Sequence, residues 1–277
     1  MCKIDFHVHT SCSDGLLSPI EVVNRAKQNS VSYLAITDHD TLSGLDAGIK
    51  CGNELDVKII PGIELSTQCN NESIHLLGFF KDNSYNNPKL INELDKIKNH
   101  RIIRAKEIIK KLNTEFNIII NFDDVLSNGK DTIARPHIAR AIINAGYPYD
   151  NEYIFQNFIG KDCRAYVPTL KLSTEDGVSL LKSYNALVFL AHPKLITNSP
   201  IDKFLKMNLD GIEAIYFQNT KGEEEKFINI SIANNLLISC GSDFHGNLND
   251  DKKHGDIGSM NMPSIYLKNF LNALNIK

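Results

Sequence analysis

Several features that would direct the interpretation elsewhere are missing from this sequence of 277 residues. No apolar run approaches the roughly 18 residues that a transmembrane helix needs, so a membrane-spanning protein is not expected. The formal net charge is only −3, so no overall basic field makes nucleic-acid binding the default. Any nucleic acid must be held at a local site, and neither a stable nucleic-acid complex nor a membrane partner is expected.

Neither a disulfide framework nor a cleavable signal sequence is expected. The six cysteines contain no Cys-x-x-Cys motif, and a chain of this size does not depend on a disulfide framework. Lys3, Asp5 and His7 interrupt the region where the apolar part of a cleavable signal would lie. These absences favour a reduced, cytoplasmic setting. The absence of tryptophan, beside much Asn, Ile and Lys, indicates the base composition of the source genome and not a function.

The two ends of the chain alternate strands with helices. The start Ser18-Pro19, with Glu21 three residues after the cap, is typical of a helix. Expected strands cover 3–7, 32–36, 57–60, 73–80, 187–190, 211–217 and 236–240, and expected helices cover about 18–30, 43–55, 173–184 and 222–234. Helices between successive buried strands indicate parallel pairing. Seven strands predict an α/β fold, a distorted TIM-like (β/α)7 barrel.

The middle of the chain follows a helical pattern. Residues 89–113 predict a long polar helix, with shorter helices over 135–145 and 152–158, and the strand signal returns only at 165–167. The basic residues of the long helix, Arg101 and Arg104 among them, alternate with acidic ones and are expected on a solvated face. We interpret 99–168 as a helical insertion domain that contributes to the substrate site, and 1–98 with 169–277 as the barrel.

Six of the nine histidines lie at or just after the ends of short apolar runs, usually with a carboxylate nearby. In a barrel of parallel strands, the loops after the carboxyl ends of the strands converge on one face. A lone buried histidine is more often a hydrogen-bonded core residue, but a whole set at strand ends predicts a metal site. The expected ligands are His7, His9, Asp14, His39, Glu64, His75, His192, Asp243 and His245. Imidazole and carboxylate without thiolate suit two to three divalent ions, Mn²⁺ before Zn²⁺ or Fe²⁺.

The order of the motifs carries a family resemblance. His7-Val8-His9, Thr37-Asp38-His39-Asp40, Gly62-Ile63-Glu64, Ala191-His192-Pro193 and Ser242-Asp243-Phe244-His245 follow one another along the chain. The chain resembles the PHP (polymerase and histidinol phosphatase) family over nearly its whole length. Within that family it is most similar to the stand-alone phosphoesterases that act on 3′,5′-nucleoside bisphosphates and on the 5′ ends of short RNA.

The resemblance also implies a trinuclear site and its ligands. His7, His9, Glu64 and Asp243 would hold one ion. Glu64 would bridge to a second ion on His75 and His192, and Asp14, His39 and His245 would hold the third. Many related amidohydrolases use a bridging carbamylated lysine instead. Here Glu64 stands at the strand end, which disfavours a deaminase or an amidase.

The expected insertion contains a basic motif, Ala134-Arg135-Pro136-His137. An arginine at a helix N-terminus favours a phosphate oxyanion, although a solvated arginine and a helix-capping histidine are the plain alternative. The resemblance implies that Arg135 and His137 contact phosphate near the metals and serve catalysis together with Glu64. Lys194, directly after His192-Pro193, is expected to add a basic contact, with a solvated loop lysine as the alternative.

Two further residues receive plainer expectations. His254 follows the last strand in a loop that we expect on the surface. Glu213 ends no ligand motif and is expected to support the site or the fold.

Clustered divalent ions suit phosphoester hydrolysis, because metal-activated hydroxide forms near neutral pH and can attack phosphorus in line. Together with this chemistry, the resemblance implies a phosphatase or 5′→3′ exonuclease for small nucleotides, such as 3′-phosphoadenosine 5′-phosphate, or for short oligonucleotides. A histidinol-phosphate phosphatase would share the metal site but is not expected to carry this insertion. A non-catalytic metal-binding accessory domain is the alternative from another class.

Overall fold

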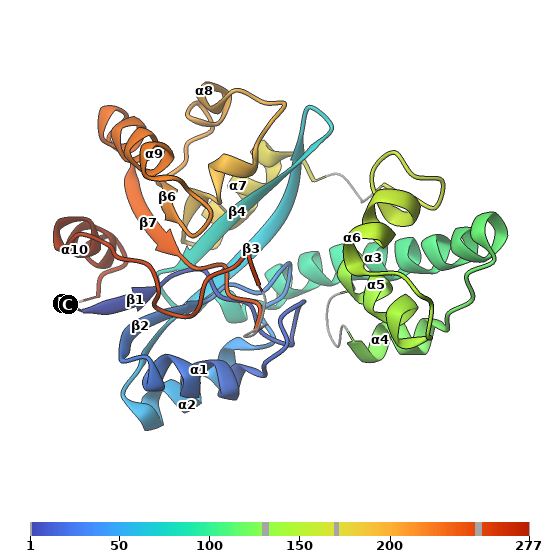
Figure 1. Ribbon diagram of the computed structural model, residues 1–277. Coiled ribbons are helices and arrows are strands. Elements are labelled where there is room, and N and C mark those ends of the chain that lie inside the picture. Colours follow the sequence, from blue (N-terminus) through green and yellow to red (C-terminus); the bar gives the residue numbers. More distant parts are fainter. Residues whose placement is uncertain (1, 129–132, 169–171, 247–250, 277) are drawn as a thin grey trace.

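The computed structural model describes residues 2–128, 133–168, 172–246 and 251–276. Within these ranges, seven strands form one sheet in chain order. The strands are β1 Lys3–Asp5, β2 Val31–Ile36, β3 Lys58–Cys69, β4 Glu72–Phe80, β5 Ala186–Leu190, β6 Gly211–Tyr216 and β7 Leu237–Gly241. The backbone N–H of Phe6 donates to Cys240 at 3.0 Å, and Val8 forms a parallel bridge with Phe244, so the first and last strands meet. The predicted seven-stranded, TIM-like barrel is confirmed (Figure 1).

Helices surround this barrel, and most lie where the sequence predicts them. They are α1 Pro19–Gln28, α2 Leu45–Leu55, α7 Thr174–Ser183, α8 Ile201–Phe204, α9 Lys221–Ala233 and α10 Ser264–Ala273. Short 3₁₀ turns cover Asn83–Asn86 and Pro193–Leu195. The expected capping box at the start of α1 is present, since Ser18 Oγ accepts from Glu21 N–H and Glu21 reaches back to Ser18 N–H. The sequence did not predict α8 or α10.

One strand departs from the predicted parallel arrangement. β3 runs to Cys69 and turns directly into β4, which pairs antiparallel with both β3 and β5. The turn consists of Asn70 and Asn71, both with positive φ, as a tight two-residue hairpin requires. Glu64 therefore lies within β3 and not at its end. Because β4 runs in the opposite direction, its beginning, and not its end, carries His75 to the rim.

The helices in the middle of the chain stand to one side of the barrel (Figure 1). They are α3 Pro88–Phe116, α4 Phe122–Asn128, α5 Arg135–Asn144 and α6 Asn151–Ile154, followed by a π-helical turn over Phe155–Ile159. The expected strand at 165–167 is wrong, since this segment is irregular. α3 packs Leu90 and Leu94 in the barrel core, whereas its later residues Ile108 and Leu112 pack in a separate cluster with α4 and α5. A single helix thus connects two cores.

Two expectations about the whole chain can be compared with these coordinates. All six cysteines lie within the described ranges and are free thiols, as the missing cysteine pairs predict. In the part of the chain that the structure describes, no helix is both long and apolar enough to cross a membrane.

The C-terminal helix α10 packs one aromatic ring into the barrel. The ring of Phe270 stacks on Phe6 at 4.3 Å between centroids and meets Phe79 and Phe189 edge-on at 5.1 and 5.5 Å. Phe270 is fully buried, so α10 is held by this contact among strands β1, β4 and β5.

We expect Phe270→Ala to lower the free energy of unfolding by about 3–5 kcal/mol, because it removes a large buried ring and leaves a cavity. Urea denaturation followed by circular dichroism measures the change. Ile265→Ala on the same helix is the control, since Ile265 is 57% exposed and its loss should cost less than about 0.5 kcal/mol. Equal effects of the two variants would contradict this role of α10.

Candidate metal centre

A buried carboxylate lies at the centre of the barrel rim. Glu64 on β3 is 1% exposed. Five histidines from different strands and loops surround it, each with a ring nitrogen within 3.2 Å of a carboxylate oxygen: His7, His9, His39, His75 and His192. Oε1 faces His75 and His192, both at 2.8 Å, and Oε2 faces the other three. Both oxygens of this carboxylate therefore face imidazole nitrogens.

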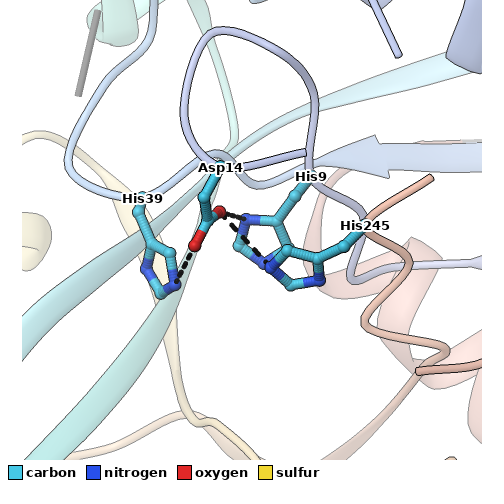
Figure 2. Close-up of side chains that lie close together, drawn as sticks. All are labelled: His9, Asp14, His39 and His245. Carbon is cyan, nitrogen blue, oxygen red and sulfur yellow. Dashed lines mark ion pairs between the residues drawn. The ribbon is translucent and has the colours of Figure 1, made fainter. Parts of the chain in front are cut away.

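A second group lies beside it around Asp14, in the loop after β1 (Figure 2). Asp14 Oδ1 is 3.3 Å from His245 Nε2 and 3.6 Å from His9 Nδ1, and its Oδ2 is 3.9 Å from His39 Nε2. One donor atom from each of these four residues lies within 4.8 Å of the others, so together they could hold a metal ion. His9 faces Glu64 with Nε2 and Asp14 with Nδ1, and so connects the two groups.

Asp243 completes the cluster from the end of β7. Its Oδ1 lies 3.2 Å from His9 Nε2 and 3.4 Å from His7 Nε2, and its Oδ2 accepts from the Tyr216 hydroxyl at 3.1 Å. His7, His9, Glu64 and Asp243 form a further possible metal site. All nine side chains expected from the sequence therefore lie in one continuous cluster.

The chemistry of the cluster fits divalent cations. Asp14 Oδ1 and His39 Nδ1 are buried and make no hydrogen bond, although Asp14 Oδ1 lies 3.3 Å from His245 Nε2 and His39 Nδ1 lies 3.2 Å from Glu64 Oε2. Buried polar atoms without partners are rare, because their desolvation is not compensated. Nitrogen and oxygen donors without thiolate suit Mn²⁺, Zn²⁺ or Fe²⁺. A cation next to Asp14 and His39 would give both atoms a partner.

The electrostatics agree with this interpretation. Burial alone would raise the pKa of Glu64 and of Asp14, but the neighbouring imidazoles outweigh it and hold both pKa values well below the ordinary range. Burial lowers the pKa of His9, yet its bonds with Asp243 and Glu64 reverse this and raise the value to about 10. The metal-free centre therefore combines ionised carboxylates with protonated rings.

Further carboxylates hold the ligands in place from behind. Glu213 lies on β6. Its Oε1 is 2.9 Å from His7 Nδ1, and its Oε2 accepts a hydrogen bond from the backbone N–H of His192 at 2.8 Å. Orienting partners of this kind fix the ring tautomer of a ligand histidine. The expectation that Glu213 supports the site agrees with these contacts.

Two other supporting carboxylates were missed in the sequence. Asp5 accepts from the backbone N–H of Ser242 at 3.0 Å and of Gly258 at 2.9 Å, and burial raises its pKa to about 6. Asp38 accepts from Thr10 N–H at 2.7 Å and from Ser13, and so orders the loop that carries Asp14. A charged residue inside an otherwise apolar strand was the signal available for Asp5.

His254 is closer to the centre than its expected surface loop suggests. Its ring lies 4.2 Å from that of His245 between centroids, and its Nε2 is 4.0 Å from Asp243 Oδ2. Asp251 Oδ2 is 2.7 Å from its Nδ1. Asp243, His245 and His254 form a fourth group that could hold a metal. His254 is therefore a further candidate ligand, which the sequence pattern did not reveal.

A cavity of about 490 Å³ opens beside the metal cluster. Asp14, His39 and His75 line it from the barrel. Arg101, Arg104 and Arg135 line it from α3 and from the start of α5. The expectation that Arg101 and Arg104 lie on a solvated face is wrong: Arg101 is 8% exposed and pairs with Asp40, and Arg104 is half-buried. The side of α3 that carries Arg101 and Arg104 faces the cavity, where Arg101 forms an ion pair with Asp40.

The three predicted substrate residues have different surroundings. His137 is fully buried; its Nδ1 accepts from Ala134 N–H at 3.0 Å, and its Nε2 has no partner. Arg135 Nη1 donates to the carbonyl of Ile159 at 3.3 Å, and its guanidinium lies in the cavity wall. Lys194 binds Glu223 at 2.7 Å and the carbonyl of Gln218. A substrate contact of Lys194 stays a prediction.

Comparison with known proteins connects this geometry to a family. Residues 5–113 match the PHP domain family. The first part of the chain is thus similar to a PHP domain. The match includes His7, His9, Asp14, His39, Glu64 and His75. The remaining expected ligands, His192, Asp243 and His245, come from the later strands of the same barrel and complete the cluster of the PHP domain.

Similar proteins extend the likeness beyond residues 5–113. A 5′-3′ exoribonuclease of Haemophilus influenzae is 29% identical over 250 residues, which cover 88% of this chain and 90% of that protein. A 3′,5′-nucleoside bisphosphate phosphatase of Chromobacterium violaceum is 28% identical over 253 residues, 88% of each chain. The crystal structure of a candidate metal-dependent phosphoesterase from Bifidobacterium adolescentis has a TM-score of 0.85 at 28% identity, covering 98% and 96% of the two chains. The predicted resemblance to the PHP family is confirmed, and the likeness to these proteins indicates a metal-dependent phosphoesterase, a hydrolase.

We expect the metal-free PHP centre to release protons when it binds Mn²⁺ at about pH 7.5, because ligand rings must be neutral. The pKa of His9, raised to about 10 by its bonds with Asp243 and Glu64, keeps its ring protonated until the ion arrives, and the neighbouring carboxylates raise the pKa of His7 as well. The apparent affinity for Mn²⁺ should therefore fall as the pH is lowered. Calorimetric titration in two buffers with different ionisation enthalpies measures the released protons. Identical heats in both buffers would contradict the expectation.

Proposed function

We propose that this phosphoesterase hydrolyses phosphate esters of nucleotides: 3′,5′-nucleoside bisphosphates, such as 3′-phosphoadenosine 5′-phosphate, and the 5′ ends of short RNA. One observation carries the proposal. The cavity is lined both by candidate metal ligands and by three arginines. Phosphate esters are the substrates that such a combination of hard cations and guanidinium groups suits.

The proposal assigns nine side chains to two or three divalent ions, with Mn²⁺ as the first choice. One ion would lie on His7, His9, Glu64 and Asp243. A second would share Glu64 with His75 and His192, and a third would lie on Asp14, His39 and His245. When bound, such ions lower the pKa of water and neutralise phosphoryl oxygens.

The residues of the insertion would position the phosphate. Because Nδ1 of His137 accepts a backbone hydrogen bond, the neutral ring carries its proton on Nε2, which is directed away from the helix backbone without a partner. Burial lowers the pKa of His137 to about 4, so the ring is neutral at physiological pH. We infer that Nε2–H donates to an oxygen of the phosphate being hydrolysed.

The domain division follows the same logic. We propose that residues 1–98 and 169–277 supply the barrel and its metals, and that residues 99–168 supply the substrate wall. The separate hydrophobic cluster of the middle helices supports this division. Nucleotide substrates are favoured over histidinol phosphate by the relatives that act on nucleoside bisphosphates and RNA.

A substrate panel tests the proposal. With Mn²⁺, we expect phosphate release from 3′-phosphoadenosine 5′-phosphate and mononucleotide release from a short 5′-phosphorylated RNA. We expect a kcat/KM at least roughly 10²-fold lower for histidinol phosphate, because it lacks a second phosphate for the arginines. Turnover of histidinol phosphate alone would favour the alternative phosphatase. No turnover of any ester by a fully metal-loaded protein would favour an accessory, non-catalytic domain.

The metal assignment has its own test. We expect His39→Ala to lower kcat/KM by on the order of 10²-fold or more, because the supporting partners of a ligand alone are worth 10- to 100-fold. The bound metal, measured by atomic emission, should fall in parallel while the circular dichroism spectrum stays unchanged. His100→Ala is the matched control, because His100 is exposed on α3. Near-normal activity of His39→Ala would refute the assignment.

A further inference from the structure

The hydroxyl of Tyr216 on β6 contacts the metal cluster from behind. Tyr216 is fully buried, and its hydroxyl donates to Asp243 Oδ2 at 3.1 Å. Burial alone would raise the pKa of Asp243, but the rings of His7 and His9 outweigh it and hold this pKa well below the ordinary range. Because an ionised carboxylate only accepts hydrogen bonds, the proton of the Tyr216 hydroxyl is directed at Asp243.

The two oxygens of Asp243 therefore have different surroundings. Oδ1 faces two candidate ligands, His9 Nε2 at 3.2 Å and His7 Nε2 at 3.4 Å. Oδ2 accepts from Tyr216, and His254 Nε2 lies 4.0 Å from it, which is beyond hydrogen-bond distance. The hydroxyl of Tyr216 thus occupies one oxygen of Asp243 and leaves the other for a metal ion.

An irregularity in β6 directs Tyr216 toward the metal cluster. Residues three positions apart in a regular strand point to opposite faces. Glu213 and Tyr216 nevertheless both face the cluster, since Glu213 contacts His7 and Tyr216 contacts Asp243. The pairing register of β6 with β7 shifts between Glu213 and Ile215. A bulge of one residue changes the alternation of the side chains, so this shift brings both supporting groups to the same side.

The segment after β6 holds the hydroxyl from its other side. Gln218 Nε2 donates to the Tyr216 hydroxyl oxygen at 2.8 Å. The ammonium of Lys194 binds both the carbonyl of Gln218 and Glu223 Oε2, the latter at 2.7 Å, and Asn219 N–H donates to the carbonyl of Tyr216 at 2.9 Å. The hydroxyl of Tyr216 therefore has a donor on one side and an acceptor on the other, and both are fixed by the fold.

We propose that Tyr216 is a positioning residue that makes Asp243 bind its metal ion through Oδ1 alone and thereby disfavours Ca²⁺ at this site. This inference rests on the proposed metal assignment and not on the choice of substrate. Ca²⁺ favours many oxygen ligands, often both oxygens of one carboxylate, whereas Mn²⁺ also suits the imidazoles of His7 and His9. An Asp243 with only one available oxygen offers Ca²⁺ less than Mn²⁺ in this set of ligands.

Metal titrations test the role of Tyr216. Tyr216→Phe removes the hydroxyl but keeps the ring, whose centroid lies 5.5 Å from that of His192. We expect the affinity for Mn²⁺ relative to Ca²⁺ to fall roughly 10-fold or more, because the partners that orient metal ligands are worth 10- to 100-fold in metal affinity. Calorimetric titration of the full-length, EDTA-treated protein with each ion measures this ratio. An equal change of both affinities, or no change in either, would overturn the proposal.

Two further variants complete the comparison. Tyr85→Phe removes the hydroxyl of another buried tyrosine, which packs against Phe80 at the end of β4 away from His75, and it should leave both affinities unchanged. Gln218→Glu keeps Tyr216 but places a competing acceptor beside its hydroxyl, so the ratio should fall in the same direction as in Tyr216→Phe. Gln218 is partly exposed, and this variant carries the test if Tyr216→Phe does not fold. An unchanged ratio in Gln218→Glu would then overturn the proposal.

The titrations separate this inference from the proposed function, because they do not measure hydrolysis. A ratio that depends on Tyr216 in a protein that hydrolyses no nucleotide would keep the positioning role and reject the function. Hydrolysis of nucleotides with a ratio that is indifferent to Tyr216 would do the reverse. An unchanged protein that binds neither Mn²⁺ nor Ca²⁺ would reject the metal assignment and the role of Tyr216 with it.

Discussion

The contact of one buried carboxylate with five imidazole rings is the constraint on which the rest of this structure depends. Glu64 has histidines on both oxygens, and they come from the segment after β1, from the loop after β2, from β4 and from the segment after β5. Each of these segments must reach the rim at the correct height for its ring to meet Glu64. The strand order, the hairpin and the closure of β1 against β7 can therefore all be understood as means of bringing these rings to one carboxylate.

The antiparallel strand illustrates the constraint. If β4 ran parallel to β3, a crossover connection would have to separate them, and the beginning of β4 would lie at the opposite end of the barrel. With the two-residue turn at Asn70 and Asn71, His75 lies opposite Ser66, two residues beyond Glu64 on β3. The pairing of β3 and β4 is therefore antiparallel and not parallel, and this direction places His75, near the start of β4, next to Glu64.

The sequence predicted much of this arrangement, because strand ends and metal ligands leave local signals. The barrel and the cluster of nine side chains follow from short apolar runs that end in His, Asp or Glu, and the capped helix α1 follows from Ser18, Pro19 and Glu21. Other features had no local signal. The length of β3 and the direction of β4 depend on pairing across the sheet, and the burial of Arg101 depends on Asp40, which is 61 positions away. His254 reaches the rim only through its pairing with Asp251 and the packing of its ring on His245. The prediction that Arg101 lies on a solvated face failed because a charged side chain can be buried when the fold brings an oppositely charged residue, here Asp40, next to it.

The position of α3 in two cores has a consequence for how such an enzyme can change over evolutionary time. Its first turns belong to the barrel and its last turns to the helical cluster, and the cavity is lined partly by the barrel and partly by residues 101–168. Substitutions in the helical cluster can reshape the second part of this wall while the barrel keeps its own packing. Arg101 is the exception, because it reaches from α3 to Asp40, the neighbour of His39. A lineage could therefore acquire new substrates by varying the wall and conserve its chemistry, provided that this one ion pair is kept.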